Sequence, residues 1–255
     1  MLAAAPAFSQ TQEDLTKGSR NTDNVVNYGL DYHQTRYSPL KQINKQNVKR
    51  LVPVWSVSLG SNYGEQGQPL VYDGVLYAGN AEYTVAVDIG TGKQLWRTPV
   101  NFDASVPRVV CCGISNKGLA IYNAKICRGT LDAFLVALDV KTGKQVWKQK
   151  VAEWKEGFSI TGAPLVANGV VITGISGAEF GVRGFLDGYD PETGKDRVLH
   201  AHGDYPALAF RGRHIRADQP GIVDDRYSED SAGIACELVQ RAQVNRDSWW
   251  SHLFQ

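Results

Sequence analysis

The sequence predicts an all-β protein, specifically a β-propeller of four-stranded antiparallel blades, and three observations support this prediction. A motif recurs along the chain with a constant period, and each repeat holds two turns of the kind that close β-hairpins. The 255 residues include 26 Gly, 6 Trp and 11 Tyr, a composition that favours a turn-rich β fold over a helical one. About three blades and a lead-in segment fit into a chain of this length.

The repeated motif is centred on aspartates at positions 88, 139 and 190, which are 51 residues apart in both steps. Its three copies are Ala-Val-Asp-Ile-Gly-Thr-Gly-Lys at residues 86–93, Ala-Leu-Asp-Val-Lys-Thr-Gly-Lys at 137–144 and Gly-Tyr-Asp-Pro-Glu-Thr-Gly-Lys at 188–195. A fixed period of this length is the signature of a repeat architecture, in which each repeat is one structural unit.

Each repeat is predicted to fold into two β-hairpins. The Thr-Gly pair supplies the glycine with positive φ that a tight turn requires, so one hairpin forms around it. A second hairpin lies between the copies, at residues 70–77, 118–126 and 164–172, and its turn is Asp-Gly in the first segment and Asn-Gly in the third. Two hairpins per repeat make one four-stranded sheet, which is the blade of a propeller.

Tryptophan follows the Thr-Gly turn at a fixed distance in the first two copies, as Trp96 and Trp147, and Trp55 precedes them in the chain. A large aromatic side chain at one place in every blade is expected to dock that blade against its neighbour. We therefore predict a structural role for these three tryptophans and no catalytic one. The third copy should carry its tryptophan at position 198, where the sequence has Val198.

The chain changes character after residue 195. Residues 1–195 contain thirteen Lys and seven Arg, whereas residues 196–255 contain no Lys, seven Arg and four of the five His. Because the repeat also loses its pattern there, we expect propeller blades over 20–195 and a non-homologous tail over 196–255. A reading-frame change near residue 195 explains both differences, and a genuine added module such as a docking segment is the alternative.

Residues 1–19 are expected to lie outside the blades. Residues 2–10 resemble the end of a secretory signal, and a disordered alanine-rich terminus is the alternative. The formal net charge is +1, with 27 Lys+Arg against 26 Asp+Glu, so the chain lacks the charge excess of a nucleic-acid binder. No apolar run approaches the roughly 18–20 residues that cross a bilayer. We therefore expect no nucleic-acid partner and no membrane span.

Two of the four cysteines are adjacent, Cys111 and Cys112. A disulfide between neighbours closes an eight-membered ring and strains the peptide bond between them, so such a ring indicates a functional site. Two buried free thiols at the start of a strand are the alternative. Cys127 lies in a predicted strand and is expected to be a core residue.

Three runs of residues together identify a family. They are Val-Cys-Cys-Gly-Ile-Ser-Asn-Lys-Gly at 110–118, Ser-Ile-Thr-Gly-Ala-Pro at 159–164 and Ser-Gly-Ala-Glu-Phe-Gly-Val-Arg-Gly at 176–184. These runs resemble the quinoprotein alcohol dehydrogenases, eight-bladed propellers that bind pyrroloquinoline quinone (PQQ). The segment from Asn27 to Val48 is also similar to the N-terminal part of that family. The resemblance covers about residues 20–195 and does not extend into the tail.

The resemblance implies that Cys111 and Cys112 form a vicinal disulfide, which lies flat against one face of the quinone. Thr161 matches a hydroxyl that contacts the cofactor. The family has an arginine where this chain has Lys117, a residue that reaches the quinone oxygens. Lysine keeps the charge but loses the planar fork of arginine, so the redox properties of the cofactor are expected to differ.

The resemblance also implies a turn that holds a cofactor carboxylate, formed by Ser176, Gly177 and Ala178. Glu179 matches the carboxylate that binds the metal, Ca²⁺ or a lanthanide, through a hard oxygen ligand. A further cofactor-binding glutamate of the family falls at Gln66 in this chain. We select its neighbour Glu65 as the acid, because a local bulge can re-aim the side chain.

The function implied by the resemblance is oxidation of alcohols to aldehydes, in which a metal polarises the quinone, an aspartate accepts the alcohol proton and a hydride passes to PQQ. That aspartate, a second metal ligand and a stacking tryptophan belong to later blades, so no catalytic residue is predicted in this chain. We expect an N-terminal part of such an enzyme that is inactive alone. The family also implies a periplasmic location and a cytochrome c-type electron acceptor.

A non-enzymatic scaffold is the alternative function. Lipoproteins of outer-membrane assembly share the Asp-x-x-Thr-Gly-x-x-x-Trp repeat without the cofactor site. The cysteine pair at 111–112 and the turn at 176–179 favour the dehydrogenase, because a scaffold needs neither a strained thiol ring nor an inward carboxylate.

Overall fold

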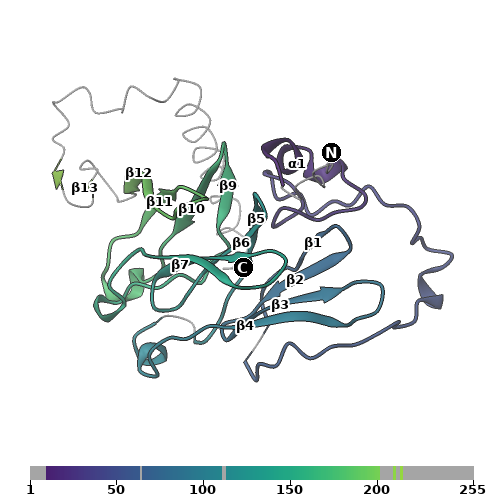
Figure 1. Ribbon diagram of the computed structural model, residues 1–255, viewed down its shortest axis with the longest axis horizontal. Helices are drawn as coiled ribbons and strands as arrows, with labels where there is room; N and C mark the ends of the chain where they lie inside the picture. The colour runs from purple at the N-terminus through teal and green to yellow at the C-terminus, as the bar shows by residue number, and fades with distance from the viewer. Residues whose placement is uncertain (1–9, 64, 111–112, 202–208, 211–212, 215–255) are drawn as a thin grey trace, which may run out of the picture. The chain divides into compact units, whose positions relative to one another are not determined.

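The computed structural model describes residues 10–63, 65–110, 113–201, 209–210 and 213–214, which form three four-stranded antiparallel sheets and a two-stranded ribbon (Figure 1). The predicted all-β fold with four-stranded antiparallel blades is therefore confirmed. The helical segments of this described part are short, and none of them is long and apolar enough to cross a membrane.

Each sheet is a meander, in which every strand pairs with the next strand of the chain. The first sheet consists of β1 (Leu70–Tyr72), β2 (Val75–Gly79), β3 (Tyr83–Asp88) and β4 (Gln94–Pro99). The second consists of β5 (Ala120–Tyr122), β6 (Lys125–Gly129), β7 (Phe134–Asp139) and β8 (Gln145–Lys150). In both sheets the first and second strands form one predicted hairpin, and the third and fourth strands form the other.

The third sheet consists of β9 (Leu165–Ala167), β10 (Val170–Gly174), β11 (Phe185–Tyr189) and β12 (Asp196–Ala201). Its last strand begins at Asp196, the residue at which the tail was predicted to start. Val198 pairs with Gly188, as Trp96 pairs with Ala86 and Trp147 with Ala137 in the other sheets. Strand pairing uses the backbone, so the register of the repeat continues through β12 although the tryptophan is replaced. The ribbon is made of β13 (Ala209–Phe210) and β14 (Arg213–His214).

The helical segments are α1 (Gln12–Thr16) and the 3₁₀ turns η1 (Gly18–Arg20), η2 (Val48–Arg50), η3 (Val106–Arg108), η4 (Trp154–Glu156) and η5 (Ala178–Phe180). The helix α1 lies within the predicted terminal segment 1–19 and starts with a capping box, in which Thr11 and Asp14 satisfy each other's backbone N–H groups. Leu15 on this helix is buried in the core.

The N-terminal segment is bonded to all three sheets. The Gln10 side chain accepts a hydrogen bond from the N–H of Ala124, at the turn after β5. Val25 forms an antiparallel bridge with Val71 in β1. The Tyr32 hydroxyl donates to the carbonyl of Val166 in β9, at 2.8 Å. The lead-in segment thus fastens the beginnings of the sheets together.

The Thr-Gly turns form as predicted. Their glycines have φ values of 71°, 69° and 70° at Gly92, Gly143 and Gly194. The aspartate of the motif closes each turn: Oδ1 of Asp139 accepts hydrogen bonds from the N–H and the hydroxyl of Thr142, at 2.8 and 2.7 Å. Asp88 and Asp190 make the same pair of contacts with the threonine three residues later.

The predicted docking role of the tryptophans is confirmed. Trp147 Nε1 donates to the carbonyl of Pro191 in the third sheet, and a Cβ atom added to Gly194 would lie 2.6 Å from the Trp147 ring. The ring therefore packs directly on the Thr-Gly turn of the next sheet. The same hydrogen bond joins Trp96 to Val140 and Trp55 to Ile89, at 3.1 and 2.9 Å. The segment around Trp55 thus packs against the first sheet through the same tryptophan contact by which β4 packs against the second sheet.

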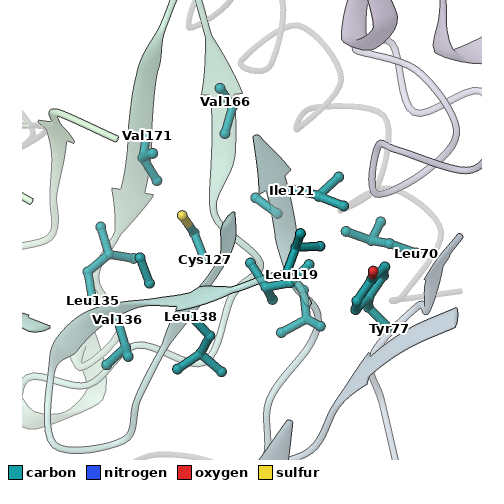
Figure 2. Close-up of a cluster of buried hydrophobic side chains, with 14 of the residues drawn as sticks. Leu70, Tyr77, Leu119, Ile121, Cys127, Leu135, Val136, Leu138, Val166 and Val171 are labelled. Atoms are coloured by element: carbon teal, nitrogen blue, oxygen red, sulfur yellow. The ribbon is translucent and has the colours of Figure 1, made fainter. Parts of the chain in front are cut away.

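The hydrophobic core extends through all three sheets (Figure 2). Its buried members include Leu70, Tyr77, Leu119, Ile121, Leu135, Leu138, Val166 and Val171. Cys127 in β6 is completely buried among them, which confirms the prediction that it is a core residue. Burial raises the pKa of its thiol to about 12, so it stays protonated and unreactive at neutral pH.

Candidate functional site

Three of the predicted cofactor residues precede the first strand of a sheet. Glu65 precedes β1, Lys117 precedes β5 and Thr161 precedes β9. The beginnings of these strands are in contact from sheet to sheet. Gln68 and Gly118 form a parallel bridge, and the Lys117 N–H donates to the carbonyl of Thr161 at 2.8 Å. The fold therefore brings together residues that are more than forty positions apart in the sequence.

A pair of hydroxyl groups lies next to this contact. Thr161 Oγ1 and Ser176 Oγ are 3.1 Å apart, and the Thr161 side chain is buried. Ser176 is held in place by Ser159, because the two residues exchange backbone hydrogen bonds of 3.1 and 2.7 Å. The structure thus places the backbone of Lys117 and the hydroxyl groups of Thr161 and Ser176 close together, and their role toward a cofactor stays a prediction.

The turn at 176–179 has a backbone that requires glycine. Gly177 has a φ of 134°, and a Cβ atom at this position would lie 2.1 Å from the carbonyl oxygen of Gly157. The 3₁₀ turn η5 follows directly, closed by a hydrogen bond from the Phe180 N–H to the Gly177 carbonyl. Ala178 and Glu179 stand on this turn and are exposed. The Glu179 carboxylate is therefore accessible to a ligand.

Glu65 is exposed, and its carboxylate oxygen Oε1 accepts a hydrogen bond of 3.1 Å from Nδ2 of Asn80. Asn80 itself is buried at the corner between β2 and β3. Gln66 is also exposed. The side chain of Gln68 is directed to the lead-in segment, where its oxygen accepts from the N–H of Gly29. Of these two neighbours, Glu65 is the acid, and its carboxylate is anchored by Asn80.

The predicted pair Cys111 and Cys112 lies outside the described residues. Before the pair, Val110 is buried beside η3. After the pair, the side chain of Ser115 is buried, and its hydroxyl has no hydrogen-bond partner within the described part of the chain. The same holds for the hydroxyl of Ser159, beside Ser176. Each of these two buried hydroxyls stands two residues before a predicted cofactor residue, Lys117 or Thr161.

This donor set fits a cofactor that is rich in carboxylate and carbonyl oxygens. Hydroxyl groups and an ammonium group donate hydrogen bonds, and buried hydroxyls without partners are costly unless a ligand satisfies them. The fit to a metal is only partial. Over the described ranges, no three His, Cys, Asp or Glu side chains lie together in the manner of a metal centre. Glu179 is the one predicted metal ligand among the described residues, and it is exposed.

The sequence did not indicate a set of buried polar residues behind this site. They are Asn80, Asn116 and Arg128, all of which are almost completely buried. Arg128 stands between Cys127 and Gly129 in β6, a strand whose other buried members are small or apolar. The signal in the sequence was a charged residue, Arg128, within a strand predicted to lie in the core.

Comparison with known proteins identifies the same family over the described sheets. The family described as the glucose/ethanol/alcohol dehydrogenase β-propeller domain, with PQQ as its cofactor, matches residues 26–198. The chain is 44% identical over 200 residues to the quinoprotein alcohol dehydrogenase PedH of Pseudomonas putida, which covers 76% of this chain and 33% of that protein. It is 43% identical over 241 residues to the quinoprotein ethanol dehydrogenase of Pseudomonas aeruginosa, covering 88% and 38%.

A solved structure supports the same relationship. The europium-containing methanol dehydrogenase is similar with a TM-score of 0.70 and 39% identity, over 74% of this chain and 34% of that one. The chain spans about a third of the length of the curated relatives it matches. Because the family match over residues 26–198 includes more than half of the chain, the protein belongs to the PQQ-dependent glucose, ethanol and alcohol dehydrogenase family of β-propellers.

Proposed function

We propose that this chain supplies the N-terminal blades of a PQQ-dependent alcohol dehydrogenase and one side of its cofactor site. The observation that carries the proposal is the group of residues at the contact between neighbouring sheets, where the backbone N–H of Lys117 bonds to the Thr161 carbonyl and the Thr161 hydroxyl meets that of Ser176. Such a group suits a cofactor with several carboxylates. The relatives named above are dehydrogenases, which favours this function over a non-enzymatic repeat scaffold.

In this proposal each residue has a simple task. The bonded pair of hydroxyls, Thr161 and Ser176, offers a hydrogen bond to oxygen atoms of the cofactor, and the Lys117 ammonium group offsets part of its negative charge. Gly177 lets the turn that carries Ser176 and Glu179 pack on the carbonyl of Gly157, where a side chain would not fit. A disulfide between Cys111 and Cys112 would cover one face of the quinone, and it stays a prediction.

Glu179 is proposed to give one carboxylate oxygen to Ca²⁺ or a lanthanide, since both ions prefer hard oxygen ligands. When bound, PQQ and its metal supply the polarised carbonyl that accepts a hydride from the alcohol. The aspartate that takes the alcohol proton and the further metal ligands are expected from blades outside the described residues. We therefore expect the chain alone to be inactive. Periplasmic location and electron transfer to a cytochrome c-type acceptor belong to the same proposal.

The proposal is tested by PQQ binding to the full chain. Thr161→Val keeps the shape of the side chain and removes its hydroxyl, so we expect it to weaken binding roughly tenfold, the factor that corresponds to about 1.4 kcal/mol. The dissociation constant is obtained from quenching of tryptophan fluorescence during titration with PQQ in the presence of Ca²⁺ or La³⁺.

Thr142→Val is the matched control, because Thr142 lies in the Thr-Gly turn of the second sheet and bonds to Asp139 there. We expect this variant to bind PQQ as tightly as the wild type. Equal affinities of Thr161→Val and the wild type, or no binding by the wild type, would contradict the proposed site.

A further inference from the structure

The guanidinium group of Arg128 joins the second sheet to the first. Arg128 is 2% exposed and lies in β6. Its Nη2 donates to the carbonyl of Asn80 at 2.8 Å, and its Nη1 donates to the carbonyl of Tyr83 at 3.0 Å and to the hydroxyl of Thr84 at 2.8 Å. All three acceptors belong to the corner between β2 and β3 and the start of β3. One side chain thus fixes this corner against the neighbouring sheet.

The charge of Arg128 is held by oxygen dipoles and not by an adjacent carboxylate. None of the ion pairs in the described part of the chain includes Arg128, and the nearby acid Asp132 is paired with Lys148 at 3.6 Å. Burial lowers the pKa of Arg128 to about 10, and Asp132 opposes this shift. Burying a charge without a carboxylate partner is costly, and the hydrogen bonds that Arg128 makes to the first sheet and to the carbonyl of Gly129 offset that cost.

Asn80 connects this corner to Glu65. Its side-chain oxygen accepts from the N–H groups of Glu82 and Tyr83, at 2.9 and 2.7 Å, and its carbonyl accepts from Arg128. With these contacts made, the Asn80 amide can point in only one direction. Its Nδ2 then donates to Oε1 of Glu65 at 3.1 Å. The orientation of the Glu65 carboxylate is therefore set by a buried residue that Arg128 holds.

Asn116 makes the corresponding connection to Lys117. Arg128 Nε and Asn116 Nδ2 share one acceptor, the carbonyl of Gly129, at 3.3 and 3.2 Å. Oδ1 of Asn116 accepts from the N–H of Gly118 at 3.1 Å, which closes the loop that carries Lys117. Glu65 and Lys117 precede the first strands of neighbouring sheets. Arg128 is connected to Glu65 through Asn80, and to the loop of Lys117 through the carbonyl of Gly129, which it shares with Asn116.

We propose that Arg128, Asn80 and Asn116 are positioning residues, which hold Glu65 and Lys117 at a fixed separation and orientation for the cofactor. This inference rests on the proposed function, since it assigns these residues to the same site. The three side chains are buried behind the site and do not need to touch the ligand. A planar guanidinium with several donors suits this task, because a single ammonium group cannot reach carbonyls on two sheets together.

The first test is amide hydrogen exchange on the full chain without cofactor. Arg128→Met fills the space without donors, and we expect exchange of the amides of Glu82, Tyr83 and Gly118 to accelerate about tenfold or more. Asn80→Ala should accelerate Glu82 and Tyr83 only. Val171→Ala, a core change in the third sheet, and Arg20→Met, a loss of an exposed arginine, should leave all three amides unchanged. Unchanged exchange in Arg128→Met would overturn the inference.

The second test is the PQQ titration of the same variants below their unfolding temperatures. We expect Arg128→Met to weaken PQQ binding at least about fivefold, and Val171→Ala and Arg20→Met to bind as the wild type does. Faster exchange with unchanged PQQ affinity would overturn the positioning role, while the proposed function would stand. Absence of PQQ binding by the wild type would contradict the proposed function. The exchange result would then show by itself whether Arg128 holds the loops of Asn80 and Asn116 in place.

Discussion

At the scale of single residues, the candidate site depends on positions where the backbone leaves no room for a side chain. Gly177 is the clearest case, because it combines a φ of 134° with a carbonyl oxygen of Gly157 that lies 2.1 Å from the place of a Cβ atom. The glycines of the Thr-Gly turns differ, because their φ is near 70° and the atoms next to their Cβ positions are side-chain atoms and not backbone. The turn that carries Glu179 therefore has its shape only with glycine at this position.

We expect Gly177→Ala to destabilise the chain by about 2 kcal/mol or more, because the new methyl group meets backbone and the φ angle is strained for alanine. Gly181→Ala is the matched control: it has a φ of 79° with nothing within 4 Å of a Cβ atom, so it suffers the angular strain alone. Urea denaturation of the two variants measures the difference. Equal losses would show that close packing on Gly157 does not shape the turn.

At the scale of elements, each Thr-Gly turn contains an aspartate whose ionised carboxylate accepts hydrogen bonds from the threonine of the turn. Hydrogen bonds from Thr91 lower the pKa of Asp88. Burial by itself raises the pKa of Asp139, but the hydrogen bonds from Thr142 outweigh it, so the pKa is lowered. Asp190 behaves in the same way with its own threonine. The turn is therefore most stable when the aspartate is ionised.

Stability is expected to fall in acid for this reason. Because the pKa of Asp139 in the folded chain is below its ordinary value of 3.8, the stabilisation is fully present above that value and is lost as the pH falls through the folded pKa. Asp139→Asn removes the charge, so the difference in urea midpoint between wild type and variant should be constant from about pH 7 to about pH 5 and should shrink below about pH 4. A difference that persists unchanged to about pH 3 would contradict a role for the charge.

At the scale of the whole chain, the sheets are joined by one recurring contact. The indole N–H of Trp147 bonds to Pro191 in buried surroundings, whereas that of Trp55 bonds to Ile89 in exposed surroundings. If the indole N–H is removed, water can donate a hydrogen bond to the freed carbonyl only at the exposed contact, that of Trp55 with Ile89. The same contact should therefore contribute differently to stability at the two places.

Trp147→Phe is expected to reduce the free energy of unfolding by about 1–3 kcal/mol, because the carbonyl of Pro191 loses its donor in a buried place. Trp55→Phe removes the same hydrogen bond and keeps a ring on the turn, and a smaller loss is expected there. Urea denaturation measures both. A loss in Trp55→Phe as large as that in Trp147→Phe would contradict the assignment of Trp147 as the stronger joint.

The blades were predictable from the sequence because the features that form them are local. An Asp-x-x-Thr-Gly turn, an Asp-Gly or Asn-Gly turn and a tryptophan at constant spacing specify hairpins and their docking wherever they occur. The strand β12 was not recognised, since Val198 replaces the tryptophan and the composition changes at Asp196. Its pairing with β11 depends on backbone hydrogen bonds, which composition does not reveal.

The sequence by itself determined the all-β fold, the repeat with its turns, and the family to which Thr161, Ser176 and Glu179 pointed. Only the tertiary structure decided which residues meet. The bond from Lys117 to Thr161 and the reach of Arg128 into the first sheet join residues of different repeats. Such contacts arise when separate sheets pack together. A periodic pattern describes each sheet alone, so it carries no information about what lies between them.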